Sequence, residues 1–282
     1  MNAIKTFFIL LAMFGLFLLV GYAIGGEQGM WIALMLATIF NGISFIFSDK
    51  IALAMYRAHE VTPQEAPELH KIVEELATKA GIPKPKVYIS ELDIPNAFAT
   101  GRSPSHAAVA VTRGLLDYLN YQEIKGVLAH EIAHIEHRDI LTGTIAAVIA
   151  SAISLLAQMA YYAGFFFGGR DRENGAGSIF YLLVLAILTP LIATLLQMAL
   201  SRTREYAADE RGARLAGNPL YLAHALRKLA LYSSHRPAST QEINPATSHM
   251  LIVNPFKGGL ASLFSTHPPI EKRIERLENM RF

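Results

Sequence analysis

The sequence predicts an α+β fold that is mainly helical, with four transmembrane helices in two hairpins and a small domain with a short β-sheet. Hydrophobic residues make up 52% of the 282 residues and charged residues only 17%, a balance typical of membrane proteins. Apolar stretches of about eighteen residues or more occur in two pairs, separated by polar segments. The net charge of +2 and the lack of a basic run argue against nucleic-acid binding. The chain has no Cys, which excludes disulfides and thiolate metal ligands.

Residues 1–48 are predicted to form the first transmembrane hairpin. Residues 6–26 are almost wholly apolar and residues 30–47 carry few polar side chains, so each run is long enough to span a bilayer. We expect a tight turn near residues 25–29 to join them. A cleaved signal peptide is the alternative, since Lys5 supplies a short charged start. No clear cleavage site follows, however, and the second apolar run begins almost at once.

The chain then turns polar, and residues 49–138 are predicted to form the first half of the small domain. A capping box at residues 62–65 has Pro at the first helical position and predicts a helix from residue 63 to about residue 79. Gly81 then ends the helix. Short strands are predicted at residues 86–89 and 107–111.

A helix with metal-binding chemistry is predicted at the end of this half. Asn120 is a good N-cap, and Glu123 completes a capping box. His130 and His134 are four residues apart, so their imidazoles share one helix face and can bind one Zn²⁺ from the same side. Glu131 lies beside them, placed to take a proton from a water at the metal. The alternative is a polar helix face on which both histidines are merely solvated.

A protease zinc needs a third protein ligand, and without Cys this ligand is His, Asp or Glu. Glu205 and Asp209 form another pair four residues apart. One carboxylate could bind the metal while the other accepts a hydrogen bond from the far nitrogen of a liganding His. An ordinary charged helix, in which Arg202 and Arg204 pair locally, explains the same pattern.

Residues 139–200 are predicted to form the second transmembrane hairpin. Residues 140–167 and 179–200 are apolar, and a short polar loop separates them. A buried hairpin of a soluble protein is the alternative, as is a hairpin that only dips into the membrane. Because the histidine pair precedes this hairpin and Glu205 follows it, we expect the metal to lie near the membrane surface.

Residues 201–282 are predicted to form the second half of the small domain. Pro219 begins a helix that runs to about Leu231. Residues 268–269 are both Pro and begin the last helix, in which one face carries Ile270, Ile274 and Leu277. His267 comes just before this helix. It could reach the metal site as an electrophilic helper, or it could simply fix the loop.

These motifs resemble those of the HtpX-type membrane zinc metallopeptidases, relatives of the CAAX prenyl endopeptidases within the gluzincin group. The match comprises His130-Glu131-x-x-His134, Ser-Arg-x-Arg-Glu205-Tyr-x-Ala-Asp209, and the segments 96–101, 251–256 and 265–269. These segments cover the chain nearly end to end and follow the order of the family.

The resemblance implies one zinc ion per chain, bound by His130, His134 and Glu205. It makes Glu131 the general base and Asp209 a residue that supports a zinc ligand. Residues 49–138 and 201–282 would then form the two halves of a zincin-like catalytic domain. In zincins an edge strand before the metal helix binds the substrate backbone, a part that the resemblance gives here to four residues, Asn96, Ala97, Phe98 and Ala99. A plain turn is the alternative for this segment.

The expected function is that of an integral-membrane zinc endopeptidase that cleaves misfolded or damaged membrane proteins under stress, and that also cleaves itself. Its expected partners are polypeptides and the lipid bilayer, with a homo-oligomer left open. A CAAX-type prenyl-peptide endopeptidase is one alternative, but four spans are too few to enclose a lipid-lined chamber. A non-catalytic, zinc-stabilised membrane scaffold or sensor is another, although Glu131 argues against it.

The distribution of basic residues predicts the orientation of the chain. Lys and Arg flank both hairpins on one side, whereas the loop of the first hairpin holds Glu27 and that of the second has no net charge. By the positive-inside rule, both termini and the catalytic domain should face the cytoplasm. We therefore expect a multi-pass protein of the cell inner membrane.

Overall fold

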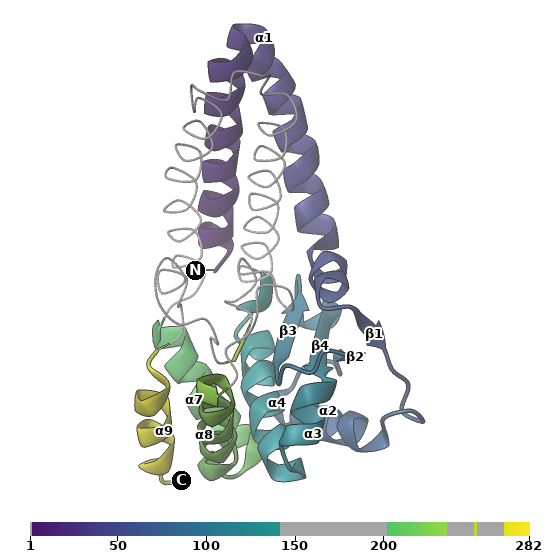
Figure 1. Cartoon of the computed structure of the whole chain (residues 1–282), viewed down its shortest axis with the longest axis vertical. Helices are drawn as coiled ribbons and strands as arrows, with labels where there is room; N and C mark the ends of the chain where they lie inside the picture. Colours follow the sequence, from purple (N-terminus) through teal and green to yellow (C-terminus); the bar gives the residue numbers. More distant parts are fainter. Residues whose placement is uncertain (1, 142–201, 236–250, 253–267) are drawn as a thin grey trace.

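The computed structural model describes residues 2–141, 202–235, 251–252 and 268–282. A long helical hairpin, α1, stands away from a compact domain that holds the sheet and the remaining helices (Figure 1). The predicted second hairpin lies almost wholly outside the described residues, as do His267 and most of the segments 251–256 and 265–269.

Helix α1 (Asn2–Met55) folds back on itself, as predicted for the first hairpin. Gly26 lies at the turn with a φ of 58°, a conformation that glycine adopts without steric cost. Several large apolar side chains of α1 are exposed: Trp31, Ile32, Met35, Leu36, Ile39, Ile43 and Phe47. Among the residues that the structure describes, no helix combines the length and the apolar character needed to cross a membrane. The transmembrane role of the four predicted helices therefore stays a prediction.

The sheet has four strands in the order β1 (Ala58–Glu60), β2 (Lys86–Ser90), β4 (Ala107–Thr112) and β3 (Ala97–Gly101). Strands β2 and β4 are parallel, and β3 pairs with β4 in the antiparallel direction. The expected strands β2 and β4 are thus present, and the segment resembling a substrate-binding strand is an edge strand rather than a plain turn. Strand β1 was not expected from the sequence.

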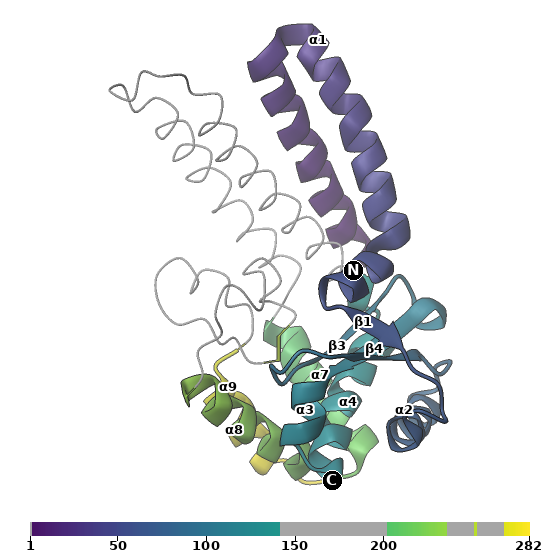
Figure 2. The ribbon, with the colours of Figure 1, turned by 45° about the vertical axis from the view of Figure 1, so that its right-hand side comes forward.

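Both faces of the sheet are covered (Figure 2). One face packs on the end of α1, where Tyr56 meets Phe98 with ring centroids 4.5 Å apart. The other face packs on the helices of the domain through Val87, Val109 and other apolar side chains. Strand β4 is buried along its whole length, which explains why its sequence is a continuous apolar run rather than an alternating one.

The first helix under the sheet, α2 (Pro67–Ala80), begins four residues later than predicted. The capping box at Thr62 and Glu65 forms its hydrogen bonds, but it closes only a turn. A helix that began at residue 63 would hold Pro67 in its interior, where proline lacks the N–H that a helix needs. The end is as predicted, since Gly81 caps the helix with a φ of 68°.

The predicted metal-binding helix is α4 (Tyr121–Glu136), and it follows the short helix α3 (Arg113–Tyr118). Asn120 and Glu123 form the predicted capping box at its start. Its apolar residues Ile124, Val127, Leu128 and Ile135 are buried. Helices α7 (Arg202–Ala216), α8 (Pro219–His235) and α9 (Ile270–Glu278) complete the described fold. Helix α8 begins at Pro219 as predicted, and α9 begins directly after Pro269, which is its N-cap.

Two glycines allow the helices of the domain to approach α4 closely. A Cβ atom at Gly126 of α4 would lie 2.5 Å from the backbone nitrogen of Leu222 in α8. A Cβ atom at Gly212 of α7 would lie 2.8 Å from the backbone nitrogen of His130. Helix α4 is therefore held between two neighbours at distances that no larger residue permits.

Gly212→Ala is expected to lower the melting temperature of the detergent-solubilised protein by about 5 °C or more, because the added methyl group meets rigid backbone of α4. Gly42→Ala is the matched control, since no atom lies within 4 Å of the added carbon. Its melting temperature should stay the same or rise slightly, because Ala favours a helix. Thermal unfolding of the three proteins checks this, and a Gly212→Ala variant as stable as the wild type would contradict the close packing.

Candidate metal centre and active site

Two imidazoles of α4 converge on one point. His130 and His134 lie one helical turn apart, and their rings are nearly perpendicular with centroids 4.6 Å apart. Their Nε2 atoms face each other at 3.1 Å. Both side chains are largely buried, so the helix presents two nitrogen ligands toward the protein interior rather than on a solvated face.

Helix α7 brings a carboxylate to the same point. Glu205 is buried, and its Oε1 atom lies 3.4 Å from His134 Nε2 while its Oε2 atom lies 3.8 Å from His130 Nε2. Tetrahedral zinc with ligand bonds of about 2.0–2.1 Å requires ligand atoms about 3.3 Å apart. The separations of 3.1, 3.4 and 3.8 Å lie close to that value, so the three side chains fit a zinc ion. Within the described segments, they form the one cluster with such geometry.

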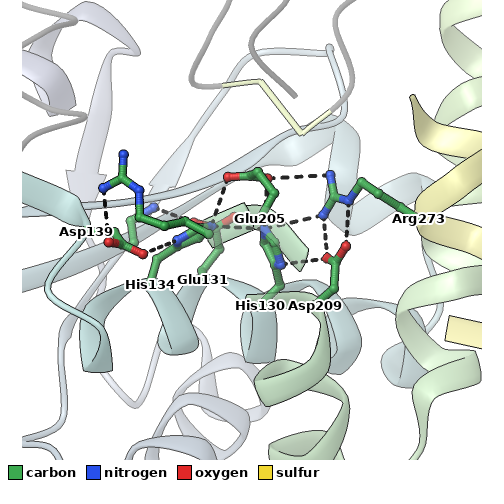
Figure 3. A network of polar contacts seen from close by, with 9 residues as sticks. His130, Glu131, His134, Asp139, Glu205, Asp209 and Arg273 are labelled. Carbon is green, nitrogen blue, oxygen red and sulfur yellow. Dashed lines mark hydrogen bonds and ion pairs between the residues drawn. The ribbon is translucent and has the colours of Figure 1, made fainter. Parts of the chain in front are cut away.

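Glu131 points from α4 toward the edge of the sheet (Figure 3). Its Oε2 atom accepts a hydrogen bond of 2.9 Å from the backbone N–H of Ala99 in β3. The carboxylate is buried and stands outside the ligand cluster. It thus lies between the candidate metal site and β3, the edge strand of the sheet that the structure describes.

Asp209 supports His130 from behind. Its Oδ1 atom lies 3.0 Å from His130 Nδ1, the ring nitrogen remote from the cluster. Arg273 of α9 donates two hydrogen bonds to the same carboxylate, of 2.8 and 2.7 Å, and approaches Glu205 to 3.8 Å. Burial opposes ionisation of Asp209, but the charge of Arg273 and the contact with His130 outweigh it and lower its pKa to about 2.

His134 has a corresponding support at the end of α4. Asp139 Oδ2 lies 3.3 Å from His134 Nδ1, and Arg204 donates a hydrogen bond of 3.1 Å to the other carboxylate oxygen. Burial lowers the pKa of His134, but the hydrogen bonds with Asp139 and Glu205 and the charge of Glu205 raise it to about 10. A metal ion binds neutral imidazole, so binding at this site would release the proton.

The formal charges favour a divalent cation. Among the described residues, four carboxylates and two guanidinium groups surround the two imidazoles, which leaves a formal charge of −2 when both imidazoles are neutral. The carboxylates belong to Glu131, Asp139, Glu205 and Asp209, and the cations are Arg204 and Arg273. A dication would neutralise this excess.

Sequence reasoning had named most of these residues and missed two of importance. Arg273 occupies the apolar face of α9 between Ile270 and Leu277, and it is 1% exposed. A charged residue at an inward helical position requires a buried partner of opposite charge, and this signal could have pointed to Asp209. Asp139 offered no such signal, because the end of α4 determines its place.

In the segment predicted to bind substrate, the backbone and the side chains have different surroundings. Asn96 is buried, and its Oδ1 atom accepts a hydrogen bond from the backbone of Ile252. Phe98 packs on Tyr56, and Ala97 belongs to the core. The structure therefore brings the backbone of this segment to Glu131, at Ala99, whereas the side chains of Asn96 and Phe98 face other parts of the protein.

Comparison with known proteins adds the family. The profile of peptidase family M48 matches residues 63–281. A protein named Protease HtpX homolog from Sulfurihydrogenibium sp. (strain YO3AOP1) is 54% identical, with 99% of this chain and 96% of that protein covered. A protein of the same name from Pyrococcus furiosus is 52% identical, with 98% and 95% covered.

Among solved structures, that of S. mikatae Ste24p is similar, with a TM-score of 0.53 and 21% sequence identity. The likeness covers 98% of this chain, which spans 65% of the length of Ste24p. At this identity the likeness concerns the fold alone.

The matched profile includes the whole ligand cluster and the supporting residues on α7 and α9. The nearly full-length relatives extend the similarity to the first hairpin. The resemblance to HtpX-type metallopeptidases is confirmed, and the chain belongs to peptidase family M48.

Proposed function

We propose that the chain is an integral-membrane zinc endopeptidase that cleaves misfolded or damaged membrane proteins on the cytoplasmic side, and that also cleaves itself. One observation carries the proposal. Glu131 lies next to a cluster of three candidate ligands and contacts the edge strand β3 of the described sheet through Ala99 at 2.9 Å. The proposed general base, the candidate metal site and the proposed surface for an extended peptide are thus adjacent.

His130, His134 and Glu205 would hold one zinc ion per chain. When bound, zinc would supply a Lewis acid for the scissile carbonyl and lower the pKa of a water molecule. The set of two nitrogens and one carboxylate also suits other divalent metals, so zinc is the proposed rather than the necessary ion.

Glu131 would move the proton. Its carboxylate accepts a proton from the attacking water and then passes it to the nitrogen of the leaving amine. In the described conformation Glu131 Oε2 accepts the N–H of Ala99. A substrate strand that pairs with β3 would take over this N–H, which leaves the carboxylate free for proton transfer.

The edge strand supports a polypeptide substrate of little defined sequence. Ala99 directs its backbone N–H away from β4 and toward Glu131, so this edge offers main-chain groups rather than specific side chains. A peptide that extends a sheet gains main-chain hydrogen bonds whatever its sequence. Such recognition suits the clearance of unfolded or damaged proteins.

The membrane part of the proposal rests on the two apolar pairs in the sequence and on the exposed apolar side chains of α1. An exposed apolar surface of this kind suits contact with lipid. The basic flanks of both pairs support a cytoplasmic catalytic domain. The chain would then work in the cell inner membrane.

Glu131→Gln tests the proposed base. The variant should keep one zinc ion per chain, while peptide cleavage falls by at least about a hundredfold, because the amide cannot accept the proton. Wild type and variant are purified in detergent without metal, Zn²⁺ is added, and the fragments of unfolded casein and of the enzyme itself are followed on a gel. Glu136→Gln is the control on the same helix, since Glu136 pairs with Arg211 outside the site.

Other outcomes of this assay favour the alternatives. A wild type that binds zinc and cleaves neither casein nor itself, but cleaves a prenylated peptide, would favour a CAAX-type enzyme. Zinc binding with no cleavage of any of the three would favour a scaffold or sensor. Cleavage by Glu131→Gln at the wild-type rate would show that another group is the base.

Arg273→Lys is expected to weaken zinc binding by about tenfold or more. Lysine keeps the positive charge but cannot donate two parallel hydrogen bonds to Asp209, which then orients His130 less well. Arg276→Lys is the matched control, because Arg276 lies on the same helix and stacks on Tyr206 at 4.2 Å. Competition with a chromogenic chelator measures both affinities, and equal values would refute the role of Arg273.

A further inference from the structure

The end of α4 returns the chain toward its own metal-binding face. Arg138 has a φ of 59°, a left-handed conformation that is uncommon for a residue other than glycine. The N–H of Arg138 donates to the carbonyl of Ile135, and the N–H of Asp139 donates to the carbonyl of His134. This pair of hydrogen bonds defines a Schellman motif. It fixes Asp139 beside His134 through the backbone.

The side chain of Asp139 then contacts His134 and Arg204. One oxygen lies 3.3 Å from His134 Nδ1, and the other accepts a hydrogen bond of 3.1 Å from Arg204. Both members of the ion pair are largely buried, with 9% of the Asp139 side chain and 15% of the Arg204 side chain exposed. A buried carboxylate in this position needs a cation, and Arg204 supplies it.

Asp139 and Arg204 also lie far apart in the sequence, on either side of a long segment. Asp139 lies just before residues 142–201 and Arg204 just after them, so their contact joins the two segments that flank this region. The same residue thus touches a candidate metal ligand and the start of α7, which carries Glu205.

We propose that Asp139 is a positioning residue for His134 and that Arg204 acts on the metal site only through Asp139. The carboxylate holds the His134 ring so that its Nε2 faces the metal, and the Arg204 guanidinium keeps the carboxylate in that place. This inference rests on the proposed metal site. It adds Asp139, which lies outside the ligand motifs, and gives Arg204 a role through Asp139.

A neighbouring ion pair provides the comparison. Glu136 and Arg211 also join α4 to α7, at 2.8 Å, but they touch no metal ligand. A pair whose task is only to hold the two helices together would behave like this one. The effect on zinc affinity therefore separates positioning from simple helix packing.

The experiment measures zinc affinity and the melting temperature of the metal-free protein, both on the full chain in detergent. Asp139→Asn should weaken zinc binding by about 10- to 100-fold, the range typical of residues that support a ligand. Arg204→Gln should weaken it less, because Asp139 keeps its contact with His134. The double variant should match Asp139→Asn within about twofold, since Arg204 acts through Asp139. Glu136→Gln should bind zinc as the wild type does.

The outcomes are distinct. Asp139→Asn with the affinity of Glu136→Gln would overturn the inference and leave the proposed metal site intact. A double variant much weaker than Asp139→Asn would overturn the part assigned to Arg204. A wild type that binds no zinc would overturn the proposed function, and the inference with it. An equal loss of zinc affinity in Asp139→Asn and Glu136→Gln would show that both ion pairs act only by holding the helices together.

Discussion

The close contact between α4 and α7 is the constraint on which the candidate metal centre depends. Glu205, Asp209 and Gly212 follow one another at intervals of four and three residues, so they share one face of α7. Gly212 lets this face touch the backbone of His130, and the two carboxylates then reach the imidazoles on either side. A larger residue at position 212 would move both carboxylates away together. Ligand geometry here is a consequence of helix packing.

His130 and His134 are each held by a carboxylate that is paired with an arginine, and different parts of the chain supply the two pairs. Each Nδ1 atom faces a carboxylate, and each carboxylate is paired with an arginine: Asp209 with Arg273 for His130, and Asp139 with Arg204 for His134. Burial of a carboxylate costs free energy unless a cation accompanies it, so the arginines are a condition of the arrangement. The result is two Nε2 atoms fixed toward one point.

The sequence was most informative where local rules decide the structure. Spacing and capping predicted α4, and the carboxylate pair on α7 was expected for the same reason. The predicted start of α2 was wrong, because the prediction followed the capping box and did not take account of Pro67, at which the helix begins. The spacing on α9 marks Arg273 as a buried charge, but it does not give the partners of Arg273, since these contacts join α9 to α4 and α7 and depend on tertiary packing. The position of Asp139 depends on the left-handed conformation of Arg138. The sequence does not predict this conformation, because a residue other than glycine rarely adopts it.

The edge of the sheet completes the relation between fold and proposed chemistry. A free edge strand tends to pair with other chains unless something covers it. In β3 the N–H of Ala99 donates a hydrogen bond to the Glu131 carboxylate. The same carboxylate is the proposed base, so the group that accepts this N–H is also the one that a bound strand would release. Binding of a peptide backbone and readiness for proton transfer would then depend on a single hydrogen bond.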